Sequence, residues 1–365
     1  MESYKLIKNF WKGRKVLITG HTGFKGSWLS LWLQKLGAEV VGISLDPPSK
    51  LNLYSQANVS KGMLSLRQDI RNGNAIKKLF QEHKPEIVFH LAAQALVRYS
   101  YQEPLETYEV NVIGTLNILE AIRGIDSVRA AVMVTTDKCY KNEETKHAYS
   151  ENDTLGGHDP YSSSKAAAEL LIASYRDSFY SSDRYESQCT AIASARAGNV
   201  IGGGDWAEDR LIPDIIRAFK KGEEVEIRNP DAVRPWQHVL DPLSGYLQLA
   251  ELLTIKGADY AEAWNFGPEA EDEFPVNWIV EQMARSWGKD AKWKVDKDDH
   301  PHEANCLKLN CKKANTKLNW HPKWDLSQSL QKIIEWHKPE NSLYSINEIC
   351  LSQIDEYSRI LAKKS

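Results

Sequence analysis

Tyr161 and Lys165 are the residues whose types and spacing point most directly to acid–base chemistry, because they stand four positions apart. On a helix that spacing places both side chains on one face. An ammonium beside a phenol favours the phenolate and lowers the phenol pKa from about 10 towards neutrality. Such a phenol can remove a proton from a sugar hydroxyl while a nicotinamide takes the hydride. The pair therefore predicts alcohol oxidation, provided that a nicotinamide site accompanies it.

A glycine-rich turn supplies the candidate cofactor site. Gly20, Gly23 and Gly26 stand between an apolar run that reads as a strand and a stretch with helical periodicity. A dinucleotide needs a tight turn there, close backbone approach to its pyrophosphate and a helix N-terminus. The spacing Gly-x-x-Gly-x-x-Gly differs from the common Gly-x-Gly-x-x-Gly, and accidental turn glycines are the alternative. Thr22 and Phe24 join the candidate contacts.

Acidic and small residues after the following strands extend this site. Asp46 lies twenty residues past Gly26, where a carboxylate accepts from a ribose diol and favours NAD over NADP. A loop aspartate before two prolines is the alternative for Asp46. The remaining candidate cofactor contacts follow the third, fourth and fifth predicted strands or the helix after the fourth: Asp69, Ile70, Leu91, Ala92, Ala93, Asn111 and Thr135.

Six apolar runs provide the strands that would position these residues: 16–18, 40–43, 63–66, 87–89, 131–134 and 191–193. Amphipathic stretches separate them, among them 24–36, a long helix through 108–119, and the helix that carries Tyr161. Fully apolar strands alternating with helices indicate a parallel sheet covered on both faces. The predicted fold class is α/β, a Rossmann-type doubly wound parallel sheet with a smaller mixed α/β lobe.

The predicted domain boundary lies near residue 195, where the regular alternation of strands and helices ends. Residues 1–195 form the NAD-binding domain, with later segments around 236–265 returning to it. Residues 196–340 are rich in short elements and prolines and form the substrate-binding lobe over the carboxyl ends of the strands. Residues 341–365 form a C-terminal amphipathic helix.

Composition narrows the class of protein. The 365 residues carry a net charge of -3, which gives no reason to expect nucleic acid as a partner. No apolar run reaches the roughly 18–20 residues that span a bilayer, and the N-terminus lacks the apolar core of a signal peptide. Five cysteines without a Cys-x-x-Cys pair are typical of free thiols in a reducing cytoplasm.

Motifs along nearly the whole chain resemble the extended short-chain dehydrogenase/reductase family: the glycine turn, His90–Gln94, Asn111–Thr115, Thr135–Lys138, and Tyr161 with Lys165. Within that family the closest likeness is to the 4,6-dehydratases that act on CDP-glucose. Further motifs carry this likeness, namely Ser44–Pro48, Thr135–Tyr140, Arg196–Trp206, Arg234–Val239 and Pro301–Ala304.

The resemblance implies three steps without net redox. NAD would oxidise C4 of CDP-glucose, water would leave across C5–C6, and the hydride would return to C6. Tyr161 would be the base for the C4 hydroxyl, with Lys165 lowering its pKa and holding the nicotinamide ribose. Thr136 would hydrogen-bond the C4 oxygen, and Asp137 would protonate the departing C6 hydroxyl. Asn111 would hold a water behind Lys165 or serve helix packing alone.

Lys138 stands where the related dTDP-glucose dehydratases carry Glu. To act as a base it must lose its proton, which costs roughly 4–5 kcal/mol at pH 7 unless burial lowers its pKa. A neighbouring Asp137 carboxylate would raise the Lys138 pKa, so the two would titrate as a pair. Lys138 is therefore either the C5 base or a cation that stabilises the developing enolate.

Cations and amides supply candidate contacts for a nucleotide diphosphate sugar. The candidates are Arg98, Arg196, Asn199, Val225, Arg234 and His302, together with Thr136, Asp137 and Lys138. The arginines could pair bidentately with phosphate oxygens, and Val225 could read the base through its backbone. A surface or structural role is the alternative for each. His302 lies in an Asp–His–Pro–His–Glu stretch that suggests metal, but no metal is expected.

Two other functions remain open at this stage. An NAD-dependent sugar-nucleotide 4-epimerase would need the ketone but not Asp137 and Lys138. A non-catalytic NAD-binding protein is the alternative from another class, and the intact Thr136, Tyr161 and Lys165 argue against it. Apolar faces in 105–123 and 159–180 resemble the family's dimer interface and predict a homodimer. Products of such dehydratases feed deoxysugar and surface-polysaccharide synthesis, including lipopolysaccharide O-antigen.

Overall fold

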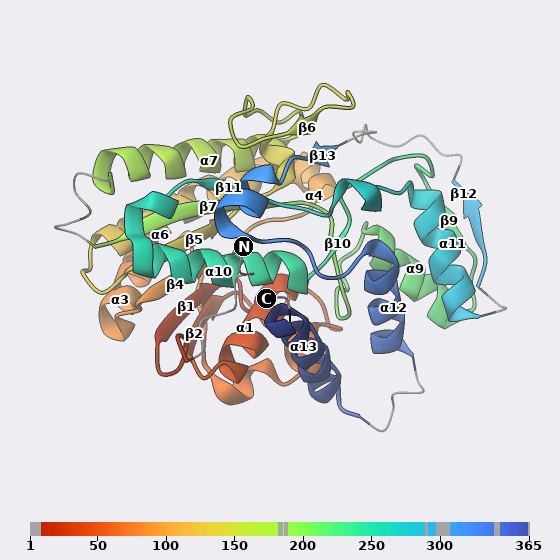
Figure 1. The fold of residues 1–365 in the computed structure, drawn as a ribbon, viewed down its shortest axis with the longest axis horizontal. Coiled ribbons are helices and arrows are strands. Elements are labelled where there is room, and N and C mark those ends of the chain that lie inside the picture. Colours follow the sequence, from red (N-terminus) through yellow and green to blue (C-terminus); the bar gives the residue numbers. More distant parts are fainter. Residues whose placement is uncertain are drawn as a thin grey trace.

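The chain's computed structural model is built on a seven-stranded parallel sheet (Figure 1). It describes residues 9–181, 185, 189–288, 291–296, 307–338 and 344–363. The strand order is β11-β7-β5-β4-β1-β2-β3. The strands are β1 (Lys15–Thr19), β2 (Glu39–Ser44), β3 (Leu64–Arg67), β4 (Ile87–His90), β5 (Ala130–Val134), β7 (Ala191–Ala197) and β11 (Ala263–Phe266). All six predicted strands are confirmed, and the prediction missed the seventh, β11.

Side-chain alternation along the strands divides the core into two layers. Val16 and Ile18 of β1 belong to one buried cluster, and Leu17 between them belongs to the other. Successive residues of a strand point to opposite faces, so each layer needs its own helices. One face is covered by α1 (Phe24–Lys35) and α10 (Leu240–Lys256), and the other by α3 (Gly73–His83), α6 (Gly114–Arg123) and α7 (Pro160–Phe179). This is the predicted doubly wound arrangement.

The helix predicted through residues 108–119 is interrupted. The chain forms α5 (Pro104–Tyr108), then a π-helical stretch over Glu109–Ile113, and then α6. Asn111 lies inside the π-helical stretch with its side chain turned inward, 1 % exposed. Single π-helical turns inside α-helices are frequent at functional sites, and apolar periodicity gives no signal for them.

The smaller lobe gathers at one end of the molecule (Figure 1). It contains α9 (Leu211–Lys221), α11 (Val276–Trp287), α12 (Leu326–His337), and a parallel pair formed by β9 (Val225–Ile227) and β12 (Trp293–Val295). Two further short pairs join β8 (Val200–Ile201) to β10 (Gln237–His238) and β6 (Ala148–Tyr149) to β13 (Lys308–Leu309). Two short helices, α2 (Leu53–Gln56) and α4 (Val97–Gln102), follow β2 and β4.

The C-terminal helix α13 (Ile346–Lys363) returns to the sheet side of the molecule and lies against α1 (Figure 1). The Tyr357 ring packs edge-on against Trp32 of α1 at 5.7 Å between centroids. Its hydroxyl donates to Asp241 Oδ1, 2.5 Å away at the start of α10. Among the described helices, none combines the length and apolarity required to cross a bilayer.

Candidate active site

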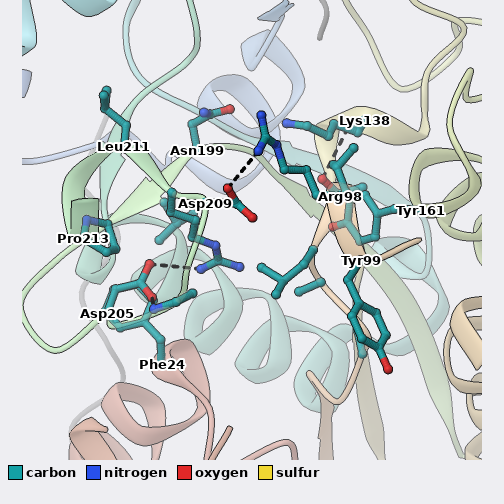
Figure 2. Close-up of a pocket in the computed structure, with 18 of the residues that line it drawn as sticks. Phe24, Arg98, Tyr99, Lys138, Tyr161, Asn199, Asp205, Asp209, Leu211 and Pro213 are labelled. Atoms are coloured by element: carbon teal, nitrogen blue, oxygen red, sulfur yellow. Dashed lines mark hydrogen bonds and ion pairs between the residues drawn. The ribbon is translucent and has the colours of Figure 1, made fainter. Parts of the chain in front are cut away.

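A cavity of ≈2070 Å³ lies between the carboxyl ends of the strands and the smaller lobe (Figure 2). This is where open α/β sheets bind ligands. Most of the predicted site residues line it. They are Gly20, Thr22, Gly23, Phe24, Gly26, Asp46, Asp69, Ile70, Leu91, Ala92, Ala93, Arg98, Thr135, Thr136, Asp137, Lys138, Tyr161, Lys165, Asn199, Val225 and Arg234.

The glycine turn leaves no space for side chains at two of its positions. Gly20 has φ +79, and a Cβ there would come within 2.7 Å of the Ala92 backbone nitrogen. A Cβ on Gly26 would come within 2.1 Å of the Gly20 carbonyl oxygen. The turn is therefore packed tightly against the β4 loop, with the N-terminus of α1 open to the cavity. This is the geometry that a dinucleotide pyrophosphate requires.

The two candidate acids at the adenosine end differ in their surroundings. The side chain of Asp46 is 87 % exposed and accepts from Arg67 Nε at 2.7 Å. Asp69 accepts from the backbone and guanidinium of Arg71. Burial alone would raise the Asp69 pKa, but these hydrogen bonds outweigh it and lower the pKa. Thr22 hydrogen-bonds Ser44 at 2.7 Å and so joins the glycine turn to the end of β2.

Tyr161 lies in the first turn of α7, where the Asp159 side chain caps the helix by accepting from the backbone of Ser162. The ring is buried at the cavity wall beside Lys138 (Figure 2). Burial raises the pKa of Tyr161 to about 12, while a hydrogen bond with Thr136 acts in the opposite direction. The lowered phenol pKa expected from the sequence is wrong, because burial of the ring dominates.

Lys165 lies one helical turn after Tyr161 and is 5 % exposed. Its ammonium donates to the Val134 carbonyl at the end of β5, at 3.5 Å. Burial lowers the pKa of Lys165 to about 8, against the raising effect of Glu169. The helix periodicity thus places both residues of the predicted pair at the cavity. The pKa of each is shifted mainly by burial.

The segment Thr136–Lys138 turns sharply after β5. Thr136 Oγ1 donates to Asp137 Oδ1 at 3.0 Å and accepts from the Lys138 backbone at 3.3 Å, which closes a short 3-10 turn. Asp137 is fully buried, and its Oδ2 has no hydrogen-bond partner among the described residues. A buried carboxylate oxygen without a partner costs free energy, which is characteristic of a group kept for chemistry.

The sequence interpretation missed two cations of the cavity. Lys25 belongs to the glycine turn itself, and burial together with Arg210 and Lys165 lowers its pKa to about 7. Arg210 precedes α9 and forms an ion pair with Asp205 at 3.0 Å. Lys25 was detectable as the one charged residue inside the glycine motif. For Arg210 the sequence offered no such signal, because it shows only a charged residue before the start of a helix.

On the lobe side of the cavity lie Asn199, Val225 and Arg234. Asn199 has φ +41, and its side-chain oxygen is buried without a hydrogen-bond partner among the described residues. Arg98 reaches across from α4 and pairs with Asp209 at 3.2 Å (Figure 2). These groups face the cavity from both the sheet and the lobe.

Three predicted contacts lie elsewhere. Arg196 does not line the cavity, because its guanidinium is buried in an ion pair with Glu169 at 2.8 Å, and the phosphate role expected of it is wrong here. Asn111 bonds Gln94 and Ser164, which links the β4 loop to α7 and agrees with the helix-packing alternative. His302 and its acidic neighbours lie outside the described residues. Within the described ranges, no group of three or more His, Cys, Asp or Glu side chains could hold a metal ion.

Comparison with known proteins places this geometry in context. The profile of the GDP-mannose 4,6 dehydratase family matches residues 17–333. The chain is 52 % identical to the CDP-glucose 4,6-dehydratase of Salmonella typhimurium, over 91 % of this chain and 92 % of that protein. It is 25 % identical to the dTDP-glucose 4,6-dehydratase of Xanthomonas campestris, over 88 % of this chain and 92 % of the relative.

Solved structures share the fold. The dTDP-glucose 4,6-dehydratase of Bacillus anthracis, in complex with NAD, superimposes with a TM-score of 0.73 at 23 % identity, over 91 % of this chain and 99 % of that one. The UDP-glucose 4-epimerase of Thermotoga maritima, with UDP-glucose, reaches 0.75 at 24 % identity, over 90 % and 99 % of the two chains. At such identities these structures establish the architecture of the sheet and lobe.

Proposed function

Because the chain belongs to the GDP-mannose 4,6 dehydratase family, we propose that it dehydrates CDP-D-glucose to CDP-4-dehydro-6-deoxy-D-glucose with NAD as its cofactor. The protein is a nucleotide-sugar 4,6-dehydratase, a hydro-lyase. The observation that carries the proposal is the buried Asp137 carboxylate beside Tyr161, Thr136 and Lys138 in one cavity, in a chain 52 % identical to a CDP-glucose 4,6-dehydratase.

The residues present fit a dinucleotide. The tight glycine turn opens the α1 N-terminus to a pyrophosphate, with Lys25 as a nearby cation. Asp46 would accept from the adenosine ribose diol, and Asp69 with Ile70 would border the adenine. The cofactor site towards the nicotinamide end would be lined by Leu91, Ala92, Ala93 and Thr135. When bound, NAD takes a hydride from C4 and later gives it to C6.

Tyr161 removes the C4 hydroxyl proton, and Thr136 hydrogen-bonds the C4 oxygen. The phenol pKa of about 12 must fall for this role, and a cation brought close to the phenol by ligand binding would lower it. Lys165 is the group placed for that task, one helical turn along the same helix face, and it would also hold the nicotinamide ribose. Each acid–base group of this kind contributes about 10²–10⁴-fold to the rate.

Asp137 gives a proton to the departing C6 hydroxyl, and a base takes the C5 proton, so one water is lost; the base is neutral Lys138, or a solvent water where Lys138 acts as the cation. Asp137 is enclosed, while Lys138 lines the cavity and is only partly buried. Lys138 acts at C5 either as the base or as the cation beside the enolate. A proton would return to C5 once C6 has taken the hydride, so the overall reaction has no net redox change.

The substrate diphosphate lies between the two sides of the cavity. Arg98 from α4 and Arg234 from the lobe supply guanidinium groups, and Asn199 adds an amide. Val225 lies on β9, where backbone groups would face the nucleobase. Preference for cytosine rests on the 52 % identical relative.

Incubation with CDP-, dTDP-, GDP- and UDP-glucose tests the proposal. We expect NAD-dependent loss of one water from CDP-glucose by mass spectrometry, together with the ultraviolet band of a 4-keto sugar under alkali. A product of unchanged mass with inverted C4 would identify a 4-epimerase instead. The absence of any NAD-dependent change across the four sugars would point to a non-catalytic NAD-binding protein.

A homodimer would bury an apolar surface on α5, the π-helical stretch and α7. Leu105 is 71 % exposed, Ile113 46 % and Leu170 61 %. Exposed apolar side chains gathered on adjacent helices are typical of an interface between copies of a chain. Sedimentation should show a dimer at micromolar concentration, and a clean monomer would contradict this assembly.

A further inference from the structure

A buried ion pair lies beneath the catalytic residues without lining the cavity. Glu169 is on α7, one turn after Lys165, and Arg196 is near the end of β7. Their side chains are 2 % and 4 % exposed, and Arg196 Nη2 is 2.8 Å from Glu169 Oε2. The cost of removing two charges from water offsets the attraction within a buried pair, so the pair adds little net stability. Its role is better sought in the segments that its hydrogen bonds connect.

The Glu169 end of the pair holds the segment that enters the catalytic turn. Its carboxylate accepts from Thr135 Oγ1 and, at 2.7 Å, from Ser194 Oγ. Thr135 directly precedes Thr136. The carbonyl of Val134, one residue earlier, is the acceptor for the Lys165 ammonium. Glu169 therefore joins α7 to the end of β5 at the point where the catalytic segment begins.

The Arg196 end of the pair holds the segment that leaves the same turn. Arg196 Nη1 donates to the Tyr140 hydroxyl at 2.8 Å and to the Glu151 carbonyl at 3.1 Å. The Tyr140 hydroxyl in turn donates to Asn265 Oδ1 on β11, at 2.7 Å. Tyr140 directly follows the 3-10 turn of Asp137–Cys139. The two partners of one ion pair thus contact the residues immediately before and shortly after Thr136–Lys138.

We propose that Glu169 and Arg196 are positioning residues that hold the catalytic segment Thr136–Lys138 in place and keep a negative charge beside Lys165. The catalytic consequences of this inference rest on the proposed dehydration, whereas its electrostatic consequence can be measured in the protein alone. Neither residue touches the cavity, so both act through the groups that they hold.

The charges around Lys165 set the sign of the electrostatic effect. Burial lowers the Lys165 pKa to about 8, and Glu169 on the same helix is the main opposing charge. His90 on β4 faces the ammonium, but burial lowers its own pKa to about 3, so it is neutral. Lys25 on α1 repels it. Without the Glu169 charge, Lys165 would lose its proton at lower pH.

The first test measures the Lys165 pKa in the ligand-free protein. Glu169→Gln combined with Arg196→Met removes both charges of the pair, so neither of the two partners is left buried without the other. Lysine-selective 13C NMR follows the ammonium, with Lys165→Met identifying its signal. We expect the Lys165 pKa to fall by roughly one unit. The partly exposed pair Glu120→Gln with Arg123→Met on α6 is the control and should leave the Lys165 pKa unchanged.

An unchanged Lys165 pKa in a folded Glu169→Gln/Arg196→Met protein would overturn the electrostatic part of the inference. Should that protein not fold, Glu169→Asp keeps the charge on a shorter side chain, and Tyr140→Phe removes only the contacts of the tyrosine hydroxyl. This measurement uses no substrate and no cofactor, so its outcome is independent of whether the proposed dehydration is correct.

The second test separates positioning from general stability. Tyr140→Phe removes the bond from Arg196 at the exit of the catalytic turn. We expect kcat for dehydration to fall roughly tenfold or more, because small displacements of acid–base groups are costly, with KM nearly unchanged. A normal kcat with only a lowered melting temperature would show that the pair is structural and overturn the positioning role.

Discussion

Gly198 lies directly against the Asp137 carboxylate, so close that a Cβ on Gly198 would come within 1.8 Å of Asp137 Oδ2. The glycine follows β7, and the aspartate follows β5 on the neighbouring strand. Close packing here encloses Asp137 while leaving its turn at the cavity. A residue far from the motif in sequence therefore shapes the proposed acid.

Gly198→Ala should push the Asp137 carboxylate out of position. We expect kcat for dehydration to fall roughly 10²-fold, because a misplaced acid protonates the C6 hydroxyl poorly. NAD binding, measured by quenching of tryptophan fluorescence, should stay near that of the unchanged protein. Gly124→Ala, where φ is likewise not positive and a Cβ would make only ordinary contacts of 3.5 Å or more, is the control for the loss of a glycine. Normal turnover in Gly198→Ala would contradict an acid role for Asp137.

NAD affinity should decrease as the pH rises through about 7. Burial lowers the pKa of Lys25 to about 7, so the side chain is a cation at pH 6 and largely neutral at pH 8. A cation beside a pyrophosphate binds more tightly than a neutral amine. Calorimetric titrations at both pH values should therefore differ, by roughly three- to tenfold if this one charge acts alone.

Lys25→Met should remove this pH dependence and leave NAD affinity at the weaker value throughout. The exposed Lys12→Met serves as the control and should retain the dependence. An undiminished pH dependence in Lys25→Met would assign the effect to another group, such as Lys165, whose pKa is about 8.

Lys138→Met should slow exchange at C5. Proton removal from C5 lets solvent deuterium enter the product, and both interpretations of Lys138 require its side chain there. We expect turnover to fall about 10²-fold and deuterium incorporation per turnover to change, as followed by mass spectrometry. Lys138→Arg distinguishes the two roles, because a guanidinium keeps the charge but does not act as a base. Wild-type turnover in Lys138→Met would remove Lys138 from the mechanism.

Patterns of local sequence predicted the sheet and the cavity wall well. Apolar runs such as 87–89 mark strands because burial on both faces demands them, and the glycine turn marks a close approach that only Gly permits. The short strand β11 was not predicted because it lacks a fully apolar run. Its four residues include Asn265, whose side chain serves hydrogen bonds instead of the apolar core.

The sequence-based interpretation was wrong for residues whose role depends on their burial and on their ion-pair partners. Arg196 has the type expected for a phosphate ligand, but the direction of its side chain depends on Glu169, whose position is known only once α7 packs on β7. Tyr161 shows the same limit, because its spacing from Lys165 is local whereas its raised pKa comes from the surrounding fold. Side-chain identity can be read from sequence, but the environment that tunes it is tertiary.

Stability should fall between about pH 4 and pH 7 because of Asp241. Burial raises the pKa of this carboxyl from 3.8 to about 7, although Tyr357 and the backbone of Lys323 donate to it. In that window the folded protein holds a proton that the unfolded chain has released, so the free energy of unfolding decreases as the pH rises. Each unit of pKa difference corresponds to about 1.4 kcal/mol.

Asp241→Asn should flatten this dependence and make the protein more stable above pH 7. The amide oxygen can still accept from Tyr357 and Lys323, and the amide cannot ionise. Denaturant unfolding at pH 5 and pH 8 measures the change, with the exposed Asp126→Asn as the control that leaves both values as they are. If Asp241→Asn lowered stability equally at both pH values, the carboxyl would be ionised in the folded state, and α13 would be held to α10 by a charged hydrogen bond.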